Sequence, residues 1–192
     1  MKKLIISILF ILCLSFQASA LGPMMLLSGG GGGVAACAKD TGTLVMDESG
    51  MSGDATWAVD NTNCVGQQFS YGSNFNLYSI EIHFNNTSSC VIDVRIGTTT
   101  DLSSYIEEWQ DVAIAADGLY EFVSSSNDLY NASTTYYIGF MEESGTCEVF
   151  QDTTSAPYNK RHLAGTVWTL GALQEDRDFH INIYKTTVTP CE

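Results

Sequence analysis

The chain has 192 residues, 45% of them hydrophobic and 16% charged, which fits one folded domain and excludes a chain that is disordered throughout. Eight basic residues against 22 acidic ones give a net charge of −14. This charge argues against a nucleic-acid-binding protein and against docking on anionic lipid, because such an acidic surface repels phosphate groups. No motif specifies one ligand or one reaction.

The N-terminus predicts export. Lys2 and Lys3 precede an apolar run over residues 4–14, and Ala18-Ser19-Ala20 fits a small-x-small cleavage site, so residues 1–20 are predicted to be a signal peptide. No other stretch approaches ~18 apolar residues, so no transmembrane span is expected. Removing the signal leaves six basic residues against 22 acidic ones, a net charge of −16. We therefore expect a secreted, periplasmic or cell-surface protein.

Residues 21–33 form a short apolar arm (LGPMMLL) followed by a serine and five glycines, and residues 34–192 are predicted to be the folded domain. The glycine run is too flexible to belong to a packed element. Two interpretations of the arm stay open. It is either a plain N-terminal tail or an extended strand that docks on a neighbouring subunit.

From residue 41 onward, apolar side chains recur at every second position, which is typical of strands with one buried and one solvated face. In chain order, strands are predicted at residues 43–47, 56–59, 64–70, 78–84, 90–96, 109–115, 119–123, 135–141, 146–151, 166–170 and 179–184. Polar clusters at residues 71–74 and 85–89 are predicted to be turns, and a single helical signal lies at residues 101–109. This pattern predicts an all-β, antiparallel sandwich.

The alternation also predicts the core. The side chains on the apolar face of the predicted strands are Phe69, Ile80, Ile82, Ile92, Val94, Phe140, Phe179, Ile181 and Ile183.

The order of the segments resembles that of jelly-roll-like β-sandwich domains of bacterial exported and surface proteins. The similarity covers residues 55–187 and is carried by GQQFS at residues 66–70, the alternating residues 77–84, and LYNASTTYYIGF at residues 129–140, where Ala132, Thr134 and Tyr136 supply a loop typical of these domains. Such domains are similar in layout to carbohydrate-binding modules. The resemblance therefore implies a sandwich fold and favours glycan binding, without a catalytic signature.

Five cysteines follow the signal peptide, and in an oxidising compartment they predict two disulfides and one spare thiol that could join another chain. Cys90 and Cys147 both lie on strands of the proposed core, so we predict that they pair. The second bridge is left open among Cys37, Cys64 and Cys191. A competing interpretation is that Cys37 carries a lipid, because VAAC at residues 34–37 resembles a lipobox.

Motifs for enzyme chemistry are missing from the sequence, which contains neither G-x-S-x-G nor a P-loop, so no catalytic residue and no cofactor are predicted. His83 and His180 fall on outward strand positions and are interpreted as solvated, with shared metal binding favoured only if their strands are neighbours. The carboxylate clusters at residues 107–111, 142–143 and 175–178 are interpreted as solvated charge. A structural calcium ion would find its ligands among Asp40, Asp47, Glu48, Asp54 and Asp60.

Aromatic side chains at loop or outward positions are the candidate ligand-binding residues, because an exposed ring can stack on the C–H face of a sugar. They are Trp57, Tyr71, Tyr105, Trp109, Tyr158 and Trp168. The main functional hypothesis is a non-catalytic, exported β-sandwich that binds a glycan or another cell-surface polymer. The alternative is a structural subunit of an extracellular assembly that uses the N-terminal arm, and a hydrolase is third.

Overall fold

The computed structural model describes residues 37–47, 55–59, 61–62, 64–153, 161–162, 165–174 and 177–190, without the side chains of residues 86–88 and 161–162. The predicted signal peptide and the arm at residues 21–33 lie outside this part of the chain. Within it, no helix is long and apolar enough to cross a bilayer.

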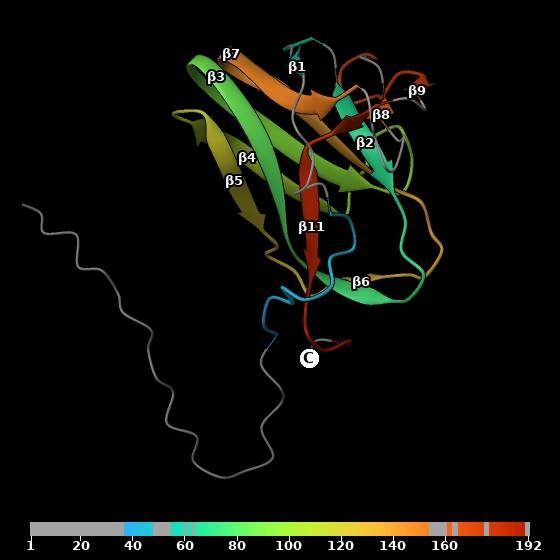
Figure 1. Cartoon of the computed structure of the whole chain (residues 1–192). Helices are drawn as coiled ribbons and strands as arrows, with labels where there is room; N and C mark the ends of the chain where they lie inside the picture. Colours follow the sequence, from blue (N-terminus) through green and yellow to red (C-terminus); the bar gives the residue numbers. More distant parts are fainter. Residues whose placement is uncertain are drawn as a thin grey trace, which may run out of the picture. The chain divides into compact units, whose positions relative to one another are not determined.

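The described residues form antiparallel strands and no helix (Figure 1). The strands are β1 (Ala55–Ala58), β2 (Val65–Phe69), β3 (Phe75–Gly97), β4 (Glu107–Ile114), β5 (Gly118–Val123), β6 (Leu129–Tyr130), β7 (Tyr136–Asp152), β8 (Arg161–His162), β9 (Leu173–Gln174), β10 (Asp178–Phe179) and β11 (Ile181–Lys185).

The two longest strands, β3 and β7, pair with each other from Phe84 opposite Val149 to Gly97 opposite Tyr137. Their register shifts three times between Asn86 and Ile92, and Figure 1 shows both as long, curved arrows. Such bulges bend a strand without ending it. The prediction of turns at residues 85–89 and of separate strands at residues 135–141 and 146–151 was therefore wrong, because the polar residues keep their backbone pairing through the bend.

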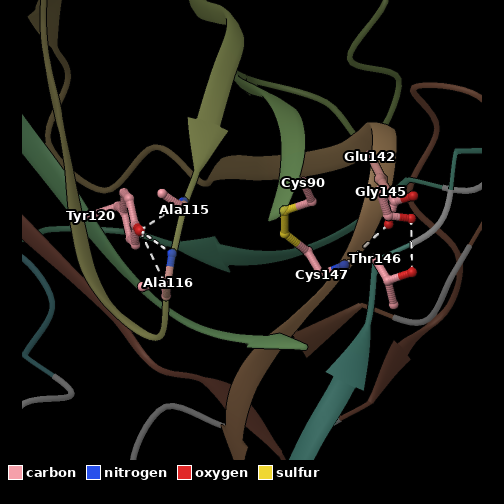
Figure 2. Close-up of a disulfide and its surroundings, with 8 residues drawn as sticks. All are labelled: Cys90, Ala115, Ala116, Tyr120, Glu142, Gly145, Thr146 and Cys147. Atoms are coloured by element: carbon pink, nitrogen blue, oxygen red, sulfur yellow. Dashed lines mark hydrogen bonds between the residues drawn. A yellow bond between two sulfur atoms is a disulfide. The ribbon is translucent and has the colours of Figure 1, made fainter. Parts of the chain in front are cut away.

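The other strands are arranged around this pair. The hydrogen-bonded order is β11-β3-β7-β2-β8-β9, and β1 and β10 also pair with β7. Along β3, strand β5 pairs with residues 79–84 and β4 with residues 90–96. The turn from β4 to β5 is closed by the Tyr120 hydroxyl, which accepts the N–H groups of Ala115 and Ala116 (Figure 2).

The nine predicted core residues are all buried, with exposed fractions of 5% or less. They belong to one hydrophobic cluster, and a smaller cluster contains Cys64, Leu102, Met141 and Leu170. Side-chain alternation is therefore a correct guide to the interior of these strands.

Three local predictions were wrong. Residues 101–109 form no helix, since the Asp101 carboxylate accepts the N–H and hydroxyl of Ser103 in a turn and β4 begins at Glu107. Residues 166–170 form isolated bridges around Trp168, whose φ is 52°, instead of a strand. Residues 43–47 contribute only the bridge between Met46 and Ile183.

The cysteines follow the predicted scheme in part. Cys90 and Cys147 form a disulfide with Cα atoms 5.8 Å apart, as predicted. Such a bond is typical of an oxidising compartment. Cys37 is also disulfide-bonded, so its sulfur is not left for a lipid, and its partner lies outside the described residues. The unpaired thiol is Cys64, in agreement with the one spare thiol that was predicted, and because it is fully buried it does not reach another chain. Burial raises the pKa of Cys64 to about 12.

Candidate functional site

A pocket of about 490 Å³ opens where β7 bends beside β1. Strand β1 forms one side of the pocket and pairs with β7, with Trp57 opposite Val149 and Ala58 opposite Glu148. Beyond β1, the Val59 N–H donates to the Cys147 carbonyl at 2.9 Å. Its lining combines one indole ring with apolar and hydrogen-bonding side chains: Trp57, Val59, Asn61, Val65, Glu142 and Thr146.

The bend of β7 presents the polar side of this pocket. Gly145 has a φ of 98°, and a Cβ atom there would lie 2.3 Å from the Ser89 carbonyl oxygen, so this position requires glycine. The neighbouring Thr146 hydroxyl donates to the Gly145 carbonyl at 2.8 Å. Glu142 accepts the Cys147 N–H through Oε2 at 3.3 Å, and its Oε1 bonds no described residue.

The Cys90–Cys147 disulfide lies beside these groups and links β3 to β7 at the bend (Figure 2). A cross-link at this position restricts how far the two strands can separate. The pocket is therefore lined by polar groups of β7 next to this cross-link and by the half-buried indole of Trp57 on β1.

Two further predicted aromatic residues come together elsewhere, around Arg95 of β3. The guanidinium lies 3.8 Å from the centroid of the Trp168 ring and 4.7 Å from that of Tyr105. Its Nε donates to Glu108 at 2.6 Å. Both rings are therefore occupied by a cation–π contact within the chain, although Tyr105 stays 45% exposed.

The remaining candidates do not join either group. Trp109 is half-buried, packs edge-on against Phe122 and donates its Nε1–H to the Val123 carbonyl at 2.8 Å. Tyr71 packs edge-on against Phe75. Tyr158 lies outside the described residues. Of the five candidate aromatic residues that the structure describes, only Trp57 lines the pocket.

Several polar residues have surroundings that differ from the sequence-based interpretation. Glu107 and Asp178, interpreted as solvated charge, are 3% and 0% exposed. His180, interpreted as solvated, is 8% exposed and lies beside His83. Among the proposed calcium ligands, Asp40 is bonded to Lys185, and Glu48, Asp54 and Asp60 lie outside the described residues. No described group of three or more acidic, histidine or cysteine side chains could hold a metal ion.

The residues that complete the pocket beside Trp57 were missed as a group. Glu142 was noted in the sequence only as one of two adjacent carboxylates, and Asn61 and Thr146 carry no local signal. Glu142 and Thr146 meet Trp57 because β1 pairs with the far end of β7, which no periodicity along the chain reveals.

Comparison with protein-family models, with curated proteins and with solved structures finds no match for this chain.

Proposed function

We propose that this protein is a non-catalytic, exported binding protein with a jelly-roll-like β-sandwich architecture, and that its pocket beside Trp57 holds a glycan. The observation that carries the proposal is the combination of an indole ring with amide, carboxylate and hydroxyl side chains around one pocket of about 490 Å³. Binding sites for small ligands are commonly of this size and pair an apolar surface with a few placed polar groups.

The ligand chemistry follows from the groups that are present. The Trp57 ring provides a flat apolar surface for the C–H face of a pyranose ring. Asn61, Glu142 and Thr146 provide donors and acceptors for hydroxyl groups. The net charge of −14 favours a neutral sugar over an anionic one. Export is supported by the signal-peptide pattern and by the Cys90–Cys147 disulfide.

The test is a glycan array probed with the mature protein, followed by titration of any retained glycan. Trp57→Ala should weaken binding by about fivefold or more, since a stacked ring contributes about 1 kcal/mol or more. Tyr105→Ala is the matched control, because it removes an exposed aromatic ring away from the pocket. The proposal fails if no glycan is retained, or if Tyr105→Ala weakens binding and Trp57→Ala does not.

A second candidate function, self-assembly, is favoured by the outer edge of β5. Among the described residues this strand pairs with β3 alone, and it carries Leu119 and Val123 at 54% and 50% exposure. One carbonyl of the outer edge, that of Val123, accepts the Trp109 Nε1–H. An unpaired, apolar edge can accept an added strand, and the arm at residues 21–27 is a candidate donor. Light scattering of the full mature chain and of a chain lacking residues 21–33 tests this. Oligomers that the deletion abolishes would support assembly, and a monomer in both cases would exclude it.

A further inference from the structure

Two histidines that are far apart in the sequence become neighbours on one face of the sheet. The backbone N–H of His83 donates to the backbone carbonyl of His180 at 3.1 Å. The backbone N–H of His180 donates to the backbone carbonyl of Phe150 at 2.8 Å. Ile82 and Ile181, which form a cross-strand pair next to the histidines, are both fully buried in the core. Because side chains alternate along a strand, both imidazoles leave the sheet on the opposite face.

The distance between the two rings suits a shared ion. Nδ1 of His83 lies 3.1 Å from Nδ1 of His180, with ring centroids 4.9 Å apart and an interplanar angle of 73°. Two nitrogen atoms that are each about 2.0–2.1 Å from one metal ion lie about 2.8–3.4 Å apart for bond angles between 90° and 110°. The observed separation falls within this range.

The surroundings hold the pair in place. The His83 ring packs against Phe150 at a centroid distance of 4.4 Å, and the backbone of His180 is fixed on both sides by the two bonds described above. Burial lowers the pKa of both histidines, so both rings are neutral at pH 7 and each keeps a lone pair for a ligand bond. His83 remains partly exposed, and the exposed Asp117 carboxylate lies close enough to act on its charge.

We propose that His83 and His180 form a two-imidazole site for a divalent transition-metal ion, with both Nδ1 atoms as ligands and water in the remaining positions. A paired imidazole site binds Cu(II) more tightly than Zn(II) by the usual order of affinities. The nearby Asp117 carboxylate and the acidic protein surface favour a cation at this position. Since no third described side chain joins the pair, the bound ion keeps positions open to exchange.

The test uses the mature, tag-free protein with copper(II) chloride and zinc(II) chloride in separate titrations. We expect one ion per chain, with Cu(II) bound more tightly. Loss of a supporting group costs a metal site about 10- to 100-fold in affinity, so loss of a direct ligand in His83→Gln or His180→Gln should weaken binding by at least about tenfold. His162→Gln is the matched control, because it removes the remaining histidine of the chain and should leave the affinity unchanged.

Electron paramagnetic resonance of the copper-loaded wild type gives an answer that does not depend on the folding of a variant. The proposal predicts hyperfine coupling to two imidazole nitrogens. The proposal is overturned if the copper ion couples to one imidazole nitrogen or to none, or if His162→Gln is the only variant that abolishes binding. It is also overturned if the protein binds no stoichiometric metal ion, and the two histidines then form only an N–H···N hydrogen bond. The histidine pair shares no residue with the pocket beside Trp57. The His83→Gln variant should therefore bind glycan as the wild type does, so that failure of the metal proposal and failure of the proposed function are distinguishable.

Discussion

Glu107 and Glu121 lie on the two strands β4 and β5, both of which pair with β3, yet they stabilise the chain in different ways. Glu107 is 3% exposed and accepts hydrogen bonds of 2.8–2.9 Å from the hydroxyls of Ser124, Ser125 and Ser126 and from the Ser125 N–H. All of these donors come from the loop after β5. The buried charge is therefore satisfied by neutral donors from one short segment instead of a counter-ion.

Glu121 is held by charge and lies at the surface. It faces Glu81 directly across the β3–β5 pair, and Lys39 bonds both carboxylates, at 2.6 Å to Glu121 and 3.0 Å to Glu81. The Lys39 ammonium also lies 3.6 Å from the centroid of the Tyr184 ring. Two like charges opposite each other repel, so the lysine from the N-terminal segment makes this pairing favourable.

The comparison indicates what each site depends on. The Glu107 site relies on hydrogen bonds from neutral donors to a buried carboxylate, which salt screens little. The Lys39 site relies on partly exposed ion pairs, whose contribution is small and is screened by salt. Three predictions test this difference.

The largest effect is expected for Glu107→Ala. Removing the acceptor takes the partner from four donors of the half-buried to exposed loop at residues 124–126, and hydrogen bonds to a charged group contribute about 1.5–3 kcal/mol. We expect the free energy of unfolding, measured by urea denaturation at pH 7, to fall by about 3 kcal/mol. Glu107→Gln keeps one acceptor and should cost less. A loss below ~0.5 kcal/mol for the alanine variant would show that water replaces the carboxylate at little cost.

A smaller effect is expected for Lys39→Met, which keeps the length of the stem and removes the charge. Partly exposed ion pairs contribute about 0.2–1 kcal/mol each, so the free energy of unfolding should fall by about 1 kcal/mol. High salt should reduce this difference in the same denaturation experiment. Adding Glu121→Gln to the variant should recover part of the loss, because it removes one of the two facing charges. A loss that salt does not change would contradict an electrostatic origin.

The smallest effect is a change in the pH dependence of stability. Burial opposes the ionisation of Glu121, but hydrogen bonds from Lys39 and Ser79 outweigh it, so the pKa of Glu121 is lowered from 4.5. A lowered pKa in the folded state means that this stability is present above pH 4.5 and is lost as the pH falls further.

The lysine has the opposite dependence. Burial disfavours its charge, but the bonds to Glu121 and Glu81 prevail and raise the pKa of Lys39 above 10.5, so its contribution is present below pH 10.5 and is lost as the pH rises further. Unfolding curves from pH 3 to 11 should therefore show shallower acid and alkaline losses for Lys39→Met than for the wild type. Parallel profiles for the two proteins would show that Lys39 and Glu121 are not coupled.

The sequence by itself determined the features that depend on local alternation. The period of two along residues 78–84, 90–96 and 179–184 identified the interior of the strands, because adjacent side chains of a strand must face opposite sides of the sheet. The Cys90–Cys147 disulfide was predicted for the same reason, since both cysteines lie on the inward side. The assignment of the strand interior needs no knowledge of which strands are neighbours.

Only the tertiary structure decided what meets across strands. The polar composition of residues 85–89 predicts a turn, yet their pairing with β7 keeps them within the single bent strand β3. Three contacts join residues that are distant in the chain. They are the contact of His83 with His180, the hydrogen bonds of Glu107 with the loop at residues 124–126, and the shared pocket of Trp57 and Glu142. Periodicity predicts which face of the sheet a side chain occupies, but it does not predict which residue of another strand lies next to it. Strand order and bulges depend on the packing of the whole sheet.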